Sequence, residues 1–433
     1  MAMKTQFERS IKMISVLAPL IRGLCINAAK ASRIVHTGKT PAPQNALSID
    51  LESAYRTDDA GRESFNEEAA AKALSEAYAA WEFETSPSAG TVSDAVKKQP
   101  SAIVIKRGEE TLGGFWIDRC LDAARKRRES SDDSFIEESI APELDTETVS
   151  PGLCSQCRSS VVENRVAVVT GGAQGIGKQV CSGLAASGAL VFIADRNLAA
   201  AEELAKKINA CQGKTAAIAV KADVTNEKSV EALFAVIAKE AGGLDLFINN
   251  AEELNMGSLM QQELADFELT AEVNYTGYFI TTKHASRMLR LQHFGAPRWK
   301  TDIIQINSKS GLEGSAINSA YAGSKFGSIG LTASFALELM DYNIKVNSIC
   351  PGDFFDDPLW SDPEQGLFAQ YLREGKVAGA RGIADVRSFY EAKVPMKRGC
   401  EGPDVMRAVY YIVEQEYETG QAVPVTGGQV MLH

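Results

Sequence analysis

The chain has 433 residues, 45% of them hydrophobic and 23% charged, a composition typical of a soluble globular protein of two or three domains. Its formal net charge is −11, and an acidic surface repels nucleic-acid phosphates, so we expect no nucleic-acid partner. No apolar run reaches the roughly 20 residues of a membrane-spanning helix, so we expect no membrane span. Most of the eight cysteines lie in apolar segments, which favours free thiols and a cytoplasmic location.

The first part of the chain leaves a second location open. Residues 9–48 contain basic side chains and no acid, a pattern typical of an organelle transit peptide or of a basic amphipathic helix in a cytoplasmic protein. Cys154 and Cys157 form a CxxC pair that lacks the two further ligands of a structural zinc site, and His36 is the only histidine of residues 1–160. We therefore expect no metal site.

Residues 1–160 are predicted to form an irregular, mainly helical extension. A run of Ala, Leu and Glu predicts a helix over Glu67–Phe83, and a shorter helix is predicted over Phe115–Arg128. Between them, β-branched residues predict a strand at Ala102–Ile105, and the acidic stretch Glu129–Thr148 is typical of a linker. Nothing here carries a recognisable chemistry. The extension is a remnant, a partner-binding segment or a support for an oligomer.

Residues 161–433 alternate short apolar strands with helical segments. Such alternation requires crossover connections, so it predicts an α/β domain whose parallel sheet is covered by helices on both faces. Ligands of such sheets bind at the carboxyl ends of the strands. The predicted strands are Arg165–Thr170, Leu190–Asp195, Ala216–Ala222, Leu244–Asn249, Ile303–Ser308 and Ile344–Ile349.

A glycine-rich turn, TGGAQGIG at 170–177, lies between the first strand and a predicted helix. Glycines let the backbone approach a pyrophosphate, and the helix amino terminus offers free N–H groups and a partial positive charge to that anion. The alternative is a plain glycine turn, but the strand before it and the helix after it favour a dinucleotide site. Its candidate cofactor residues are Gly171, Gln174, Gly175, Ile176 and Gly177.

The ends of the second and third strands bear on the choice of cofactor. Asp195 ends the second strand, where a carboxylate can accept hydrogen bonds from both ribose hydroxyls of an adenosine and would repel a 2′-phosphate. We therefore expect NAD rather than NADP, a preference that the neighbouring Arg196 would soften. Asp223 and Val224 follow the third strand, where they either contact the adenine or only form a strand-end turn.

Tyr321 and Lys325 are the strongest candidates for catalysis. Their spacing of four residues places them on one face of a helix. A phenol is a poor base at neutral pH, and we expect the nearby ammonium to lower the pKa of Tyr321. Tyr321 would then exchange a proton with an alcohol or a carbonyl while a hydride moves to or from a nicotinamide. Taken alone, the pair is also compatible with two surface residues.

Two further polar residues fit the same chemistry. Ser308 closes the fifth predicted strand, where its hydroxyl can orient a substrate oxygen for proton transfer. Asn274 lies inside a long helical segment, and a buried Asn there needs hydrogen-bond partners. We expect a water relay to Lys325 to supply them.

Together these motifs resemble the short-chain dehydrogenase/reductase superfamily over about residues 164–433. The resemblance implies a Rossmann-type, doubly wound parallel sheet of seven strands, NAD as cofactor, and subunit contacts that build a homo-tetramer. It also implies roles for the predicted residues: Tyr321 as acid/base, Lys325 as a further ligand of the nicotinamide ribose, Ser308 as the group that orients substrate, and Asn274 as part of a proton relay. The motifs that carry it are TGGAQGIG at 170–177, NNA at 249–251, Asn274, Ser308, YAGSK at 321–325 and PG at 351–352.

The NNA and PG motifs add Asn250 and Pro351 to the candidate cofactor residues, while Asn249 is implied to support the sheet beside the cofactor. One position departs from the family. Glycine usually follows Asn-Asn-Ala, but Glu252 stands here. Because the backbone runs close to the cofactor at this point, we expect its side chain to shift the loop or to add charge.

A narrower resemblance points to the substrate. The segments QINSKSG at 305–311, VPMKRGC at 394–400 and VTGGQVM at 425–431 resemble sorbitol-6-phosphate 2-dehydrogenases, which interconvert sorbitol 6-phosphate and fructose 6-phosphate with NAD. Lys309, Lys397 and Arg398 lie in these segments and are candidate ligands of a substrate phosphate. The two later cations are equally compatible with solvated surface charges. Residues 354–393 are expected to form a lid.

We therefore predict an NAD-dependent polyol-phosphate dehydrogenase that takes a small-molecule sugar phosphate. Two alternatives stay open. One is a reductase of the same fold for an unphosphorylated polyol, sugar or other secondary alcohol. The other is an NAD-binding interaction module without turnover, against which the intact set of Tyr321, Lys325 and Ser308 argues.

Overall fold

The computed structural model describes residues 15–22, 33–38, 46–51, 54–57, 63–85, 102–107, 110–118, 160–364, 366–373 and 375–431. The carboxyl-terminal part of the chain holds a seven-stranded sheet in the order β13-β12-β11-β10-β7-β8-β9, in which all neighbouring strands are parallel. The strands are β7 (Val166–Thr170), β8 (Leu190–Asp195), β9 (Ala217–Lys221), β10 (Leu246–Asn249), β11 (Thr301–Ile306), β12 (Ile344–Pro351) and β13 (Ala422–Val425). The predicted Rossmann-type, doubly wound sheet is therefore confirmed.

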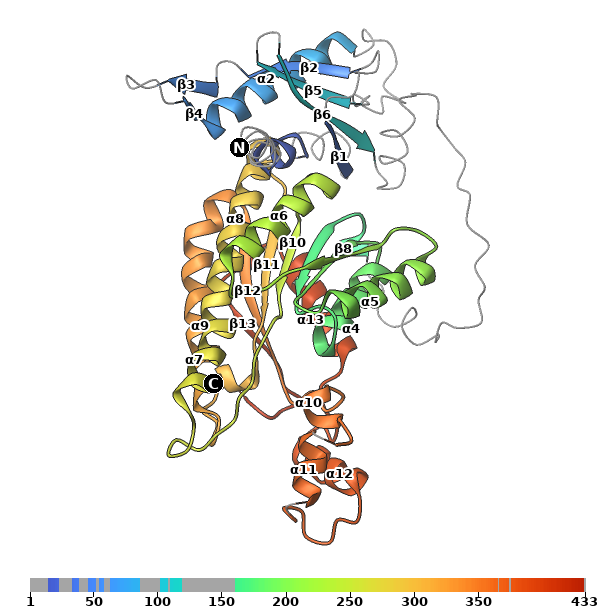
Figure 1. The fold of residues 1–433 in the computed structure, drawn as a ribbon, viewed down its shortest axis with the longest axis vertical. Coiled ribbons are helices and arrows are strands. Elements are labelled where there is room, and N and C mark those ends of the chain that lie inside the picture. Colours follow the sequence, from blue (N-terminus) through green and yellow to red (C-terminus); the bar gives the residue numbers. More distant parts are fainter. Residues whose placement is uncertain are drawn as a thin grey trace, which may run out of the picture.

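The central strands consist of apolar residues because both faces of the sheet are covered. Every residue of β7, β8 and β10 is buried. The helices α4 (Gly175–Ala186), α5 (Leu198–Gln212) and α13 (Gly402–Glu414) supply the apolar cluster on one face. The helices α6 (Glu227–Ala241), α8 (Gly277–Gly295) and α9 (Ser319–Leu339) supply the apolar cluster on the opposite face of the sheet (Figure 1). A short helix, α7 (Leu264–Ala271), joins α8 through a π-helical turn at Glu272–Thr276.

The predicted lid lies beyond the carboxyl end of β12. It contains α10 (Pro358–Ser361), α11 (Leu367–Arg373) and α12 (Ile383–Lys393), which project below the sheet in Figure 1. Its own apolar cluster is aromatic: Phe355, Trp360 and Phe368 pack with ring centroids 5.0–5.5 Å apart. The predicted lid is therefore a small folded unit attached at the carboxyl end of β12.

The extension contains more strand than predicted. The helix expected at 67–83 is confirmed as α2 (Glu67–Thr85), and the strand expected at 102–105 as β5 (Ala102–Arg107). The helix expected at 115–128 is wrong at its start, because residues 115–118 belong to β6 (Glu110–Asp118), a strand that pairs with both β5 and β1 (Arg33–Gly38). The remainder of that helix, and the predicted linker, lie outside the described residues. Residues 115–118 form a strand, and not the predicted helix, because β6 is hydrogen-bonded to β5 on one side and to β1 on the other.

The described strands of the extension form two sheets. Four strands have the order β1-β6-β5-β2, with β2 at Ala46–Asp50, and a hairpin joins β3 (Tyr55–Thr57) to β4 (Glu63–Phe65). A helix at residues 15–22 and helix α2 pack against the amino-terminal side of the parallel sheet. Glu67 of α2 accepts hydrogen bonds from Arg287 and Arg290 of α8.

Two findings bear on location. Among the described residues, no helix is long and apolar enough to cross a membrane. Cys181 and Cys350 are buried free thiols as expected, but Cys211 is disulfide-bonded, so the expectation of free thiols fails at this position.

Candidate active site

The glycine-rich turn brings three stretches of backbone into close contact. A Cβ on Gly177 would collide with the carbonyl oxygen of Gly171, and a Cβ on Gly171 would lie 2.8 Å from the Cα of Ala251. Gly171 and Gly175 also have φ of +61° and +53°, a backbone conformation that residues with a side chain rarely adopt. The turn leads directly into α4, whose amino terminus is a favourable place for an anion. It therefore fits the pyrophosphate of a dinucleotide.

The asparagine pair after β10 holds this turn in place. The Asn250 side chain donates hydrogen bonds to the carbonyls of Thr170 and Gly171 at 3.1 and 3.0 Å. Buried Asn249 accepts a hydrogen bond from Thr281 of α8. The predicted role of Asn249 in supporting the sheet agrees with this contact, and the Asn250 side chain fixes the backbone of the glycine-rich turn.

Asp195 lies at the carboxyl end of β8 with its carboxylate fixed from two sides. One oxygen accepts a hydrogen bond from the N–H of Ala173 at 3.0 Å and the other from that of Asn197 at 2.8 Å. Each oxygen retains a lone pair for another donor. The carboxylate therefore lies beside the glycine-rich turn in a position that fits an adenosine ribose.

The remaining candidate cofactor residues lie along the same edge of the sheet. Asp223 accepts hydrogen bonds from the N–H and hydroxyl of Thr225, so it forms the strand-end turn considered as the alternative. Val224 is buried next to Gly277. The others are Gln174, which is the N-cap of α4, Ile176 in the first turn of α4, and Pro351 at the end of β12.

The structure brings Tyr321, Lys325 and Ser308 together. Tyr321 and Lys325 lie one turn apart on α9, with the Lys325 Nζ 5.1 Å from the centroid of the phenol ring. Ser308, two residues beyond the end of β11, lies close enough to Tyr321 for its side chain to act on the pKa of the phenol. Tyr321 and Lys325 are only 8% and 2% exposed. Together with the partly exposed Ser308, these two buried side chains form a cluster that can hold an oxygen atom of a substrate.

Glu252 completes this cluster in a way that the sequence did not predict. Its Oε2 accepts a hydrogen bond from the Tyr321 hydroxyl at 2.9 Å, and the same oxygen lies 2.8 Å from the Lys325 Nζ. Glu252 directly follows Ala251, which packs on Gly171. The acid/base candidate and the glycine-rich turn are thus connected through this loop.

The pKa of Tyr321 runs against the expectation from the Tyr321–Lys325 pair. Burial raises it well above its usual value, and the negative charge of Glu252 raises it further, while the nearby Ser308 side chain opposes both. The expectation that Lys325 lowers the pKa of Tyr321 is therefore wrong for this arrangement. The Lys325 ammonium is paired with the Glu252 carboxylate, and this carboxylate also accepts a hydrogen bond from the phenol.

Asn274 lies in the π-helical turn before α8 and is 2% exposed. Its side chain exchanges two hydrogen bonds with the backbone of Glu253, at 2.8 and 2.9 Å, and donates a third to Ser324 at 3.1 Å. These bonds satisfy the side-chain amide of Asn274 through protein partners. Asn274 therefore fixes the segment that carries Glu252. The water relay to Lys325 stays a prediction.

Lys309, predicted to bind a substrate phosphate, follows Ser308 but is already paired. Its Nζ lies 2.8 Å from an oxygen of Asp353, which also accepts a hydrogen bond from Gln429. The charge of Lys309 is therefore largely compensated by a residue at the start of the lid.

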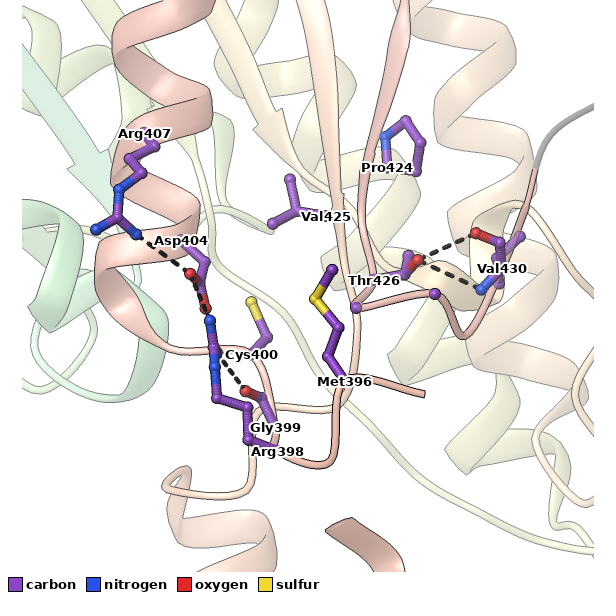
Figure 2. Close-up of a pocket in the computed structure, with 12 residues that line it drawn as sticks. Met396, Arg398, Gly399, Cys400, Asp404, Arg407, Pro424, Val425, Thr426 and Val430 are labelled. Carbon is purple, nitrogen blue, oxygen red and sulfur yellow. Dashed lines mark hydrogen bonds and ion pairs between the residues drawn. The ribbon is translucent and has the colours of Figure 1, made fainter. Parts of the chain in front are cut away.

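The other two candidate phosphate ligands do not join Lys309. Lys397 is exposed and donates to the carbonyl of Ala392. Arg398 forms two hydrogen bonds with Asp404 of α13, and Arg407 approaches the same carboxylate, as Figure 2 shows. Arg398, Asp404 and Arg407 line a cavity of about 450 Å³ between α13 and the end of β13.

Asp357 is a second acidic residue near the cofactor turn. A Cβ on Gly175 would collide with the Asp357 carboxylate, and its charge also acts to raise the pKa of Tyr321. Sequence reasoning placed Asp357 in the lid but did not link it to the turn. The contact is visible only in the tertiary structure, which places Asp357 next to Gly175 at the start of α4.

The comparisons identify the family. A family model described as short chain dehydrogenase matches residues 165–360. The sorbitol-6-phosphate 2-dehydrogenase of Escherichia coli is 39% identical over 270 residues, covering 62% of this chain and 99% of the relative. The chain belongs to the short-chain dehydrogenase family. It is thus an oxidoreductase acting on alcohol groups.

Two solved members of the short-chain dehydrogenase family extend the comparison. The sorbitol-6-phosphate 2-dehydrogenase of Erwinia amylovora is 38% identical, with a TM-score of 0.56 over 61% of this chain and 100% of that chain. The 3-ketoacyl-(acyl-carrier-protein) reductase of Brucella melitensis, solved with NADH, is 25% identical, with a TM-score of 0.52 over 62% and 100%. The similarity covers the predicted dehydrogenase domain and leaves the extension unmatched in these relatives.

Proposed function

We propose that the chain is an NAD-dependent dehydrogenase that interconverts a polyol phosphate and a ketose phosphate, of the sorbitol 6-phosphate and fructose 6-phosphate type. The observation that carries the proposal is the cluster of Tyr321, Lys325 and Ser308, which meets the glycine-rich turn through residues 251 and 252. A bound nicotinamide dinucleotide supplies the hydride acceptor for such chemistry.

In this proposal, the chain's own residues bind the cofactor and move one proton. The α4 amino terminus holds the pyrophosphate and Asp195 accepts from the adenosine ribose, which favours NAD over NADP. Ser308 orients the reacting oxygen, and the Tyr321 hydroxyl exchanges the proton with it. Lys325 steadies the nicotinamide ribose. Asn274 holds the loop that faces this cluster.

The phosphate of the substrate is supported by the likeness to two sorbitol-6-phosphate 2-dehydrogenases. One observation favours an unphosphorylated substrate instead. Lys309 is the one predicted phosphate ligand that adjoins Ser308, and it is paired with Asp353. A substrate phosphate would have to compete with that carboxylate, whereas a neutral polyol would hydrogen-bond with both groups.

The deciding experiment offers D-sorbitol 6-phosphate, D-sorbitol and galactitol with NAD or NADP and follows NADH or NADPH absorbance. We expect the highest kcat/KM with the phosphorylated substrate and NAD. Lys309→Ala should raise KM for that substrate without changing NADH affinity. Equal or better turnover of the unphosphorylated polyols would select the rival, and NADH binding without turnover of any alcohol or ketone would select a binding module.

A homo-tetramer remains part of the proposal. Support comes from large apolar side chains that stay exposed on α7, α8 and α9, namely Leu264, Phe267, Phe279, Phe326 and Leu337. Light scattering of the purified chain tests the prediction through the molar mass. The cytoplasmic location also remains a prediction.

A further inference from the structure

We propose that Glu252 is the proton partner of Tyr321: while the phenol takes a proton from the substrate alcohol, its own proton passes to the carboxylate. This inference rests on the proposed dehydrogenase function and assigns a role to the residue at which the chain departs from its family. In this proposal, the Tyr321 phenol and the Glu252 carboxylate act together as the acid/base group.

The contacts around Glu252 support this role. A single oxygen, Oε2, accepts the Tyr321 hydroxyl and pairs with Lys325. The hydrogen bond from phenol to carboxylate is therefore already formed before any reaction. Because the Lys325 charge is used to hold the carboxylate, it does not stabilise a phenolate. Tyr321 can act as a base only if its proton has somewhere to go, and Glu252 is the acceptor it touches.

The exposure of the three side chains gives the proton a path to solvent. The side chain of Glu252 is 43% exposed, whereas that of Lys325 is 3% exposed. Tyr321 is also buried. A proton that reaches Glu252 can thus leave to water from an open surface, without crossing the buried cluster.

The loop that carries Glu252 is held firmly. Asn274 binds both the N–H and the carbonyl of Glu253. A carboxylate on a fixed loop keeps its distance to the phenol, as proton transfer requires.

The proton and electron balance is complete for alcohol oxidation. The carbinol C–H bond breaks and its electron pair leaves as hydride to the nicotinamide dinucleotide, while the alcohol O–H proton bonds to the Tyr321 oxygen. The former Tyr321 proton bonds to Glu252 and is then released to water. The products are a ketone, the reduced dinucleotide and one proton, and ketone reduction runs the same steps in reverse.

The charged groups around this pair are few. From α9, Tyr321 and Lys325 face Glu252. From the lid, the charge of Asp357 acts on Tyr321, and from β12 the buried thiol of Cys350 faces Lys325. The neighbouring carboxylate, Glu253, instead approaches Arg196 at 3.9 Å. Burial raises the pKa of Cys350 to about 12, so this thiol stays protonated over the pH range of the test.

The test compares Glu252→Gln, which keeps the size but not the basicity, with Glu252→Gly, which restores the residue usual in the family. Alcohol oxidation by the wild type should be nearly level from about pH 6.5 to 9, because the phenol passes its proton to an acceptor it already touches and need not ionise first. Glu252→Gln should be slower by roughly 10²-fold or more at neutral pH and should gain about tenfold per pH unit, because its phenol must ionise first. Glu252→Gly should show the same alkaline rise. Glu253→Gln is the matched control and should keep the wild-type profile.

A second readout needs no substrate. The tyrosinate absorbance of each protein, minus that of its Tyr321→Phe counterpart, reports the ionisation of Tyr321. We expect it at lower pH in Glu252→Gln than in the wild type. Identical titrations and identical pH profiles would overturn the inference. So would a Glu252→Gly variant that is faster at every pH and binds NADH more tightly, because Glu252 would then only obstruct the site.

The two proposals fail in different ways. If the wild type binds no NADH and oxidises no alcohol, the proposed function is wrong, and the tyrosinate titration alone then decides whether Glu252 controls Tyr321. If turnover is found but Glu252→Gln leaves its pH profile unchanged, the dehydrogenase stands and the Glu252 inference is wrong.

Discussion

Replacing Arg22 by Ala should destabilise the dehydrogenase domain although Arg22 lies in the extension. Arg22 and Asp245, at the start of β10, are 1% and 0% exposed in their side chains and lie 2.6 Å apart. The guanidinium forms a second hydrogen bond to the other Asp245 oxygen at 3.0 Å and a third to Gln292 at 2.6 Å. Gly243 leaves the space that this side chain fills, since a Cβ there would lie 3.0 Å from the Arg22 Cδ.

The size of the effect follows from what the substitution leaves behind. Burial alone would raise the pKa of Asp245, but Arg22 holds it well below its usual value. Without Arg22 the buried carboxylate keeps the neutral donors Val166 N–H, Trp299 Nε1 and Gln292 Nε2, and loses the cation that was hydrogen-bonded to it. The charge of Arg165 also acts on Asp245, but Arg165 is not among these hydrogen-bond donors. Removing one partner of a buried ion pair costs about 3–5 kcal/mol. At about 2 °C per kcal/mol for a domain of this size, Tm should fall by roughly 6–10 °C.

The assay is thermal unfolding of wild type and Arg22→Ala at about pH 7.5 and about pH 5. In the wild type, the pKa of Asp245 is lower in the folded than in the unfolded protein. The ion pair therefore stabilises the fold at pH values above the unfolded carboxyl pKa. This stabilisation is lost as the pH falls through that value toward the folded pKa. In the variant, burial raises the Asp245 pKa, so the charged form opposes folding and protonation relieves the cost. The Tm deficit should therefore be larger at the higher pH.

The control is Lys207→Ala, which removes an exposed ion pair with Glu203 and should shift Tm by no more than about 1 °C. An Arg22→Ala variant whose Tm matches that of the control at both pH values would show that residues 15–22 do not dock on the sheet. A deficit that does not depend on pH would show that the loss comes from packing and not from the unpaired carboxylate.

Three further predictions concern the site. Tyr321→Phe should lower kcat by roughly 10²–10⁴-fold and leave NADH affinity unchanged, because only the hydroxyl that exchanges the proton is lost. Steady-state kinetics measures kcat and fluorescence titration measures NADH affinity. Retained turnover would show that Tyr321 takes no part in the chemistry. Gly177→Ala should weaken NADH binding at least about tenfold because the added Cβ meets the Gly171 carbonyl, and an unchanged Kd would place the cofactor elsewhere. Asp195→Ala should raise kcat/KM with NADP relative to NAD about tenfold or more, and a ratio that does not move would mean that Asp195 does not face the adenosine ribose.

The dehydrogenase domain could be predicted well because its signals are local. Six apolar strands with intervening helices, and glycines between β7 and α4, were visible in stretches of a few residues. Tyr321 and Lys325 share a helix, so their spacing alone placed them on one face. The extension was predicted less well, because residues 115–118 owe their strand to pairing with residues distant in sequence.

The sequence by itself determined the fold of residues 161–433 and the residues of the candidate site, since helix and strand periodicity and a glycine turn depend on near neighbours. Only the tertiary structure decided which charges meet. Glu252 and Tyr321 are 69 positions apart, Lys309 and Asp353 are 44 apart, and Arg22 and Asp245 are 223 apart. Coulombic forces act on distance in space and not along the chain, so no spacing in the sequence could reveal that Lys325 is compensated, that Lys309 is paired, or that the extension supplies the counter-charge of β10.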